Sequence, residues 1–125
     1  MKIVDYGGNG MCGPRVLLRT RDENLARKHL KEIIDYNIAN FKTISEKIKL
    51  SSSIESVIEA YQSIEHFKIF LTDNNSTSML LAYAASPFRE ESYIVHYGGV
   101  LINVDVFDYP VRHLKATGSH WQELI

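Results

Sequence analysis

The hydrophobic pattern of this chain changes partway along, and that change restricts the fold more than any other feature. Over residues 22–48 apolar side chains recur at steps of three and four, the period of a helix with one buried face. Over residues 93–107 the chain has two β-rich runs joined by Gly98-Gly99, a pair typical of a tight hairpin turn. The sequence therefore predicts helices first and an antiparallel sheet last, which is an α+β fold.

Local signals place the other elements. Pro14 suits the first turn of a helix, where its missing N–H would have no partner in any case. Ser52 and Glu55 have the spacing of a capping box, and Pro87 is expected to stop a short helix. We expect helices over about residues 12–21, 22–48, 52–66 and 79–85, a polar loop over 72–77 and a last strand over 120–125.

Size and charge exclude several classes of protein. The 125 residues fit one domain, and 14 basic against 15 acidic side chains give no electrostatic footprint for nucleic acid or an anionic membrane. No apolar run approaches the roughly 18–20 residues of a membrane span, and the N-terminus has no signal-peptide pattern. A single cysteine excludes an intrachain disulfide and fits a reducing compartment. We therefore expect a monomeric cytoplasmic protein without a cofactor.

That cysteine, Cys12, lies in a glycine-rich segment, residues 5–13, that leads into the first predicted helix. Unpaired N–H groups and the helix dipole favour the thiolate, which is the nucleophilic form. His120 lies far along the chain, on the last predicted strand, so the two residues form a candidate nucleophile–base pair. The backbone N–H groups of Gly10, Met11 and Cys12 would form an oxyanion hole.

Two other interpretations compete for the same loop. Gly8, Gly10 and Gly13 fit the G-x-G-x-x-G pattern of dinucleotide sites. Asp35 follows about 20 residues later in the sequence, where such sites have the acidic residue that binds the ribose. The second strand that such a site needs would fall at residues 33–34, inside the helical repeat, and no βαβ units follow. The cysteine can also be a small buried hydrophobe with no chemical role.

The remaining basic side chains give weaker signals. His29 and His66 fall on predicted helices among charged neighbours, which indicates solvated surface, and His113 falls in a predicted loop. His96 lies in a predicted strand and is a rival general base. Arg15 is expected either to contact an acidic group or to be solvated. No His, Asp and Glu group has the spacing of metal ligands, so we expect no metal site.

Residues 9–17 resemble the cysteine box of ovarian-tumour (OTU) type deubiquitinating cysteine proteases. That box is Asp-Gly-x-Cys, then two residues, then Arg or His and an apolar pair. Asn9 stands where the family usually has Asp, and Gly13-Pro14 replace a bulky pair. Residues 118–121 are similar to the family's histidine box, a His followed by an aromatic residue on the last strand. Residues 100–104 look like the central strand before that box.

The resemblance implies a papain-like, OTU-like fold over residues 1–125, with the helices packed on a small C-terminal antiparallel sheet. It implies cleavage of ubiquitin or ubiquitin-like conjugates by Cys12 through an acyl-enzyme, with His120 as base. Many members place Asp or Asn two residues after the His to orient its ring, and here that position is Gln122. Asp5 is the alternative orienter. A narrow cleft for the modifier's glycine-rich tail would lie between the two boxes and be lined by Gly118, Ser119 and Trp121.

The short chain fits a viral or bacterial version, which would act in the host cytosol. The missing acidic residue at position 122 favours a second hypothesis, a catalytically inactive OTU-like interaction domain. A third is another papain-like peptidase with a Cys-Gly-Pro box. Such peptidases generally continue past the His to a third catalytic residue, whereas only five residues follow His120.

Overall fold

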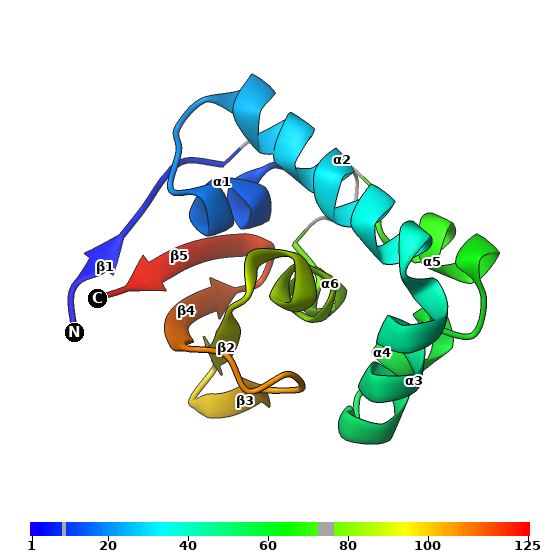
Figure 1. The fold of residues 1–125 in the computed structure, drawn as a ribbon. Helices are drawn as coiled ribbons and strands as arrows, with labels where there is room; N and C mark the ends of the chain where they lie inside the picture. Colours follow the sequence, from blue (N-terminus) through cyan, green and yellow to red (C-terminus); the bar gives the residue numbers. More distant parts are fainter. Residues whose placement is uncertain (9, 73–76) are drawn as a thin grey trace.

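Six helices and one five-stranded sheet make up the part of the chain that the computed structural model describes, residues 1–8, 10–72 and 77–125. The helices gather on one side of the sheet (Figure 1), and the predicted α+β class is confirmed. The helices are α1 (Cys12–Leu18), α2 (Glu23–Ala39), α3 (Phe41–Ser51), α4 (Glu55–Ala60), α5 (Ile64–Phe70) and α6 (Met79–Arg89). The strands are β1 (Ile3–Val4), β2 (Ser92–Tyr97), β3 (Val100–Val104), β4 (Val111–Thr117) and β5 (His120–Leu124).

The sheet is mixed, so the prediction of an antiparallel sheet is wrong. Its strand order is β1-β5-β4-β2-β3, and β2 runs parallel to β4 while the other neighbours are antiparallel. The hairpin predicted at Gly98-Gly99 is confirmed as the β2–β3 turn. Residues 100–104 form an edge strand rather than the central strand, because β4 inserts between β2 and β5. The sequence analysis had placed His113 in a loop, whereas it lies on β4.

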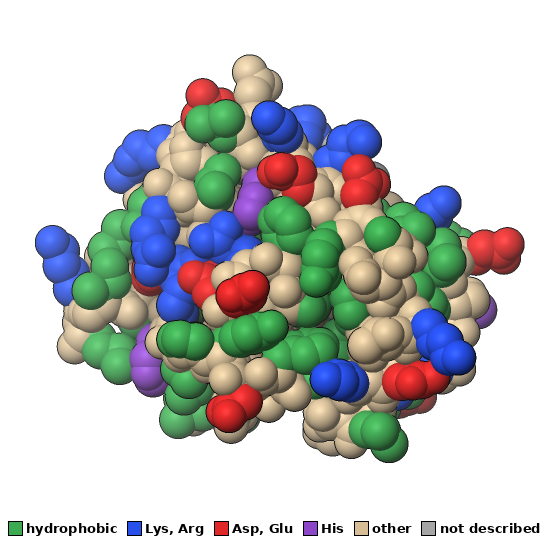
Figure 2. Space-filling model, in the orientation of Figure 1, with side chains coloured by type: hydrophobic (Ala, Val, Ile, Leu, Met, Phe, Trp, Pro, Cys, Tyr) green, Lys and Arg blue, Asp and Glu red, His purple; other side chains and the backbone are tan. Residues whose placement is uncertain are grey.

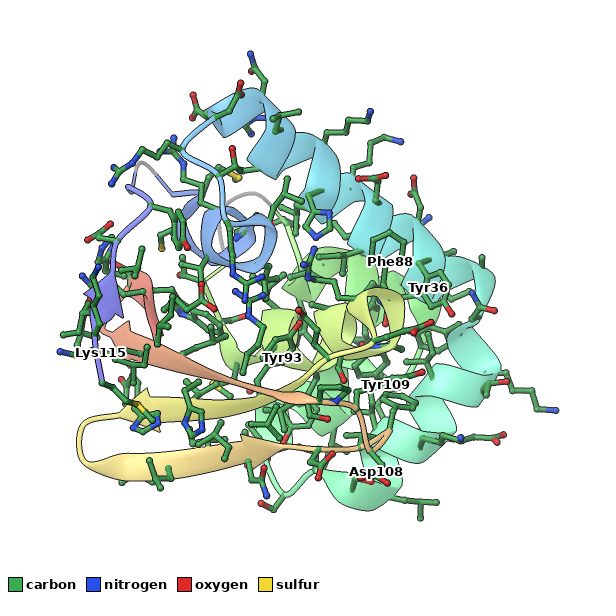
Figure 3. All side chains as sticks on the ribbon, turned by 60° about the vertical axis from the view of Figure 1, so that its left-hand side comes forward. Tyr36, Phe88, Tyr93, Asp108, Tyr109 and Lys115 are labelled. Carbon is green, nitrogen blue, oxygen red and sulfur yellow. The ribbon has the colours of Figure 1, made fainter. Side chains whose placement is uncertain are left out.

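One face of this sheet packs against the helices and the other remains open. Along β4 the side chains of Arg112, Leu114 and Ala116 are buried, while those of His113 and Lys115 between them are only partly buried. A period of two with one buried set is the pattern of a sheet covered on a single side. Figure 3 shows Lys115 on the strand side of the molecule, away from the helices α2 and α6.

The long predicted helix over residues 22–48 is two helices, because the backbone leaves helical geometry at Asn40. The Asn40 side chain donates to the Tyr36 carbonyl, the local bond by which asparagine competes with helix continuation. Within α2, buried Asn37 donates to the carbonyl of Ala84 on α6 and accepts from the Tyr61 hydroxyl at 2.7 Å. The break at Asn40 turns α3 away from α2, and Asn37 ties α2 to α6.

The other helix boundaries also differ from those predicted. The helix expected over 52–66 is split into α4 and α5, and Ser52 accepts from the Ile54 N–H before α4 begins instead of capping it. Pro87 lies inside α6, which continues to Arg89. The first helix ends at Leu18, because Arg19 takes the left-handed conformation with φ 55°. Most of the predicted polar loop over 72–77 lies outside the described residues.

A buried ionic cluster fixes α1 on the sheet. Arg112 of β4 donates to the carbonyls of Val16 and Leu17 at 2.9 and 3.0 Å, two acceptors in the last turn of α1. The same guanidinium donates to Oε2 of Glu123 on β5 at 3.1 Å, and Arg19 donates to both oxygens of that carboxylate at 2.9–3.0 Å. Both side chains of the Arg112–Glu123 pair are almost fully buried. The cluster therefore sets the position of α1 relative to β4 and β5.

Surface charge is mixed. On the face seen in Figure 2, basic and acidic side chains are interspersed with apolar ones, and no broad field of one sign forms there. None of the helices in the described ranges is long and apolar enough to cross a membrane.

Candidate active site

The Cys12 thiol lies beside the backbone of the two residues that flank His120, where α1 and β5 begin. Cys12 is the first residue of α1, and its side chain is only 1% exposed. Its thiol donates to the Ser119 carbonyl at 3.1 Å, and the Trp121 N–H also points at the sulfur. The sulfur atom therefore contacts the backbone on both sides of His120, while among the described residues no hydrogen bond joins it to the His120 ring.

Asp5 holds the His120 ring. Asp5 directly follows β1, which pairs with β5, and its Oδ2 lies 2.8 Å from His120 Nε2. Gln122 donates to the same oxygen at 2.9 Å, and the Gly7 N–H donates to Oδ1 at 2.8 Å. These bonds, led by the one to His120, lower the pKa of Asp5 below its ordinary range. Of the two predicted orienters, Asp5 contacts the ring, while Gln122 fixes Asp5.

The pKa of Cys12 shifts in the opposite direction to the prediction. Burial raises the pKa of the Cys12 thiol, although the N–H groups of Trp121, Gly13 and Cys12 itself act in the opposite direction. The expectation that the helix start favours the thiolate is therefore wrong for this arrangement. The helix is short, and a sulfur removed from water loses more hydration as an anion than these N–H groups return.

The glycine loop is shaped by Arg15. Gly7 has φ +105°, and a Cβ there would lie 2.5 Å from an Arg15 guanidinium nitrogen. Arg15 is buried and donates to the Tyr6 carbonyl at 3.4 Å, so neither predicted environment, an acidic group or water, is correct. The Met11 N–H donates to the Gly8 carbonyl at 3.3 Å in this structure.

The oxyanion role of Gly10, Met11 and Cys12 stays a prediction. For that role the Met11 N–H must give up its hydrogen bond to the Gly8 carbonyl and donate to the substrate oxyanion instead. Gly10 has φ +79°, a backbone conformation that glycine adopts without strain. Asn9, the residue at the family's Asp position, lies outside the described residues.

The predicted substrate-binding residues lie on and beside the β4–β5 turn. Gly118 and Ser119 are exposed, and Gly118 has φ +57°. Trp121 is buried instead, because its ring packs in the core and its indole N–H donates to the Thr77 carbonyl at 2.7 Å. It forms part of the lining of a hollow of about 220 Å³ with Gly118 and Met79.

The other histidines are not near the cysteine contacts. His29 is buried and lies 2.8 Å from an Arg89 nitrogen, so the prediction of a solvated His29 is wrong, whereas His66 is exposed as predicted. His96 and His113 face each other across β2 and β4 with ring nitrogens 3.0 Å apart. In the described part of the chain, no group of three or more His, Cys, Asp and Glu side chains is arranged to hold a metal ion.

The dinucleotide interpretation is wrong. The glycine loop does follow a strand and open a helix, but the chain then enters α2 without a second strand. Asp35, the candidate ribose ligand, is an exposed residue of α2 that pairs with Lys31 one turn away at 3.3 Å. A dinucleotide fold would need a parallel strand at that point.

Sequence reasoning missed the residues that hold the site together. Arg112 and Glu123 are charged residues on strands, and their burial follows from long-range packing. One signal was present in the sequence. Residues two apart on a strand point to the same face of a sheet, so Glu123 shares a face with Trp121. In the structure that is the covered face of β5.

No known protein family matches this chain, and neither does any curated protein or solved structure. The site's geometry and the resemblance of its two boxes are therefore the grounds for a function.

Proposed function

We propose that this protein is a papain-like cysteine peptidase of the OTU type that cleaves ubiquitin or a ubiquitin-like modifier at its C-terminal tail. One observation supports the proposal above all others. The Cys12 sulfur lies against the backbone on both sides of His120, and His120 Nε2 is held by the Asp5 carboxylate at 2.8 Å. A nucleophile, a base and an acidic group that orients the base are the parts of a catalytic triad.

In the proposed reaction His120 takes the proton of the Cys12 thiol and the sulfur attacks the carbonyl carbon at the end of the modifier. The C–N bond then breaks, and His120 gives its proton to the leaving amine. Water attacks the resulting thioester and passes a proton to His120, which returns it to the Cys12 sulfur as the thioester C–S bond breaks. Because Asp5 occupies Nε2, the ring nitrogen that serves Cys12 is Nδ1.

The reaction requires one rearrangement of the structure described above. The Cys12 thiol must exchange the Ser119 carbonyl for His120 Nδ1 before it can lose its proton. Asp5 supports that step, because a carboxylate next to the ring stabilises the imidazolium that forms.

The burial of Cys12 favours one alternative, an inactive OTU-like interaction domain. A side chain that is 1% exposed and has a raised pKa behaves as an ordinary core thiol. The two hypotheses differ in whether substrate binding makes the sulfur react.

The test is incubation with ubiquitin, and with a panel of ubiquitin-like modifiers, whose C-termini carry a thiol-reactive warhead, read by intact mass. We expect one covalent adduct that is lost in Cys12→Ala. His120→Gln should slow the adduct by about 10²-fold or more, while the matched control His66→Gln, at an exposed histidine on α5, should react normally. No adduct with any modifier would support the interaction domain.

A further inference from the structure

The open face of the sheet has a groove that the reaction above leaves unassigned. We call it the open-face groove. Its volume is about 650 Å³, within the range of pockets that hold ligands. It crosses β1, β5 and β4 and ends at the β2–β3 hairpin turn. Its lining includes Ile3, His96, Leu101, Lys115, Thr117 and Leu124.

Its lining is apolar and exposed. Leu101 is 63% exposed and Ile3 is 48% exposed, at opposite ends of the groove. Gly98 and Gly99 of the β2–β3 turn have no side chains, and a Cβ added to either would meet nothing within 4 Å. Exposed apolar side chains that surround a concave surface are typical of an interaction site.

The charge of the groove is one-sided. Among the described residues that line it, Lys115 and His96 are the only ones with ionisable side chains, and none has a carboxylate side chain. Lys115 stands between His96 and Gln122 in the strand register. A partner with an acidic side chain would complement this lining, and a basic one would be repelled.

The strand register places two residues of the groove, Lys115 and Thr117, next to residues of the candidate active site. Lys115 pairs with Gln122, which bonds to Asp5, and Thr117 pairs with His120 across β4 and β5. These side chains lie on the same face of the sheet, because successive residues of a strand alternate between faces. A segment bound in the groove would therefore lie on the same face of the sheet as His120, one strand from it.

We propose that the open-face groove binds an extended segment of the polypeptide substrate in which apolar residues flank a carboxylate side chain, and that Lys115 selects for that carboxylate. The inference rests on the proposed function for calling the occupant a substrate. Its apolar part covers Ile3, Leu101 and Leu124, and its acidic group pairs with Lys115 next to the Asp5–His120 pair.

The test measures binding in the Cys12→Ala protein, so that it does not depend on turnover. The probes are two fluorescein-labelled peptides with the same leucines, one with aspartates and the other with lysines between them, read by anisotropy. We expect the aspartate peptide to bind about threefold to tenfold more tightly at low salt, and the difference to shrink at about 0.15 M salt. In Lys115→Glu the preference should reverse, and Leu101→Asp should weaken the leucine contacts of both peptides.

Ile69→Asp is the matched control, since Ile69 is 67% exposed but lies on α5 away from the groove. Equal binding of the two peptides, an unchanged preference in Lys115→Glu, or an equal loss in Ile69→Asp would overturn the inference.

The same variants separate this inference from the proposed function. If Cys12 reacts with a modifier warhead but the peptides are not discriminated, the groove inference alone fails. If the peptide preference reverses in Lys115→Glu but no warhead reacts, the groove is a carboxylate-selective binding site and the catalytic proposal fails.

Discussion

Replacing Arg112 by methionine should destabilise the fold strongly, because it removes one of the three side chains, Arg112, Arg19 and Tyr6, that hold the buried Glu123 carboxylate. Arg112 bonds to Glu123 and to two carbonyls of α1, and the Glu123 side chain is 3% exposed. Breaking one side of a buried ion pair costs about 3–5 kcal/mol. Arg19 still holds Glu123 through two bonds, so we expect the lower end, about 3 kcal/mol.

Urea unfolding followed by circular dichroism measures this. With a slope of about 1.5 kcal/mol per molar urea, the midpoint should fall by about 2 M. The control is Lys115→Met on the same strand, whose side chain faces the open side and should change stability by less than about 0.5 kcal/mol. The double variant Arg112→Met with Glu123→Leu should recover most of the loss, because no buried charge is then left alone.

A loss below about 1 kcal/mol in Arg112→Met would refute the reasoning. It would mean that Glu123 finds water or another partner when Arg112 is gone. An equal loss in the single and double variants would locate the cost in the contacts of Arg112 with the α1 carbonyls and with Glu91, rather than in the Glu123 carboxylate.

Three further predictions concern the candidate site. The pKa of Asp5 is lowered in the folded state, so its carboxylate contributes stability above its unfolded pKa, and that contribution is lost as the pH falls through the folded pKa. Asp5→Asn should therefore lower the free energy of unfolding in urea at neutral pH, by under about 1 kcal/mol for a side chain 45% exposed. The difference from the unmodified protein should begin to shrink below about pH 4 and should keep shrinking as the pH falls further. Gly7→Ala should cost about 1–3 kcal/mol in thermal or urea unfolding, because it forces a positive φ and a contact with Arg15, and an unchanged midpoint would contradict the loop geometry. Iodoacetamide should modify Cys12 far more slowly in the native protein than in urea, with an inflection above the free-thiol pKa of about 8.5. An inflection below that value would show that Cys12 forms an ion pair with His120 in solution.

Local signals predicted the elements that have a strong local period. The apolar repeat before Asn40 predicts α2, and the Gly98-Gly99 pair predicts the turn of the β2–β3 hairpin, without reference to the rest of the chain. β4 was missed because buried Arg112 interrupts its alternation with a charge. Its parallel pairing with β2 has no local signal either, since the partners lie far apart in the chain.

The site was predicted in part for a similar reason. The two boxes place Cys12 and His120, and both candidate orienters turn out to lie beside the ring. Which of the two contacts the His120 ring depends on how β1 pairs with β5. That pairing comprises two residue pairs, and no local pattern in the sequence reveals it. The pKa of Cys12 was predicted in the wrong direction because its burial depends on the whole fold.

The pairing of β1 with β5 also sets the order in which the site can form. Asp5 and His120 come from opposite ends of residues 1–125, and contacts of such long sequence separation close late in folding. During synthesis the ribosome delivers Cys12 long before it delivers His120. A nascent chain therefore holds its thiol without a base, and the Asp5–His120 contact appears only after the last strand has been released.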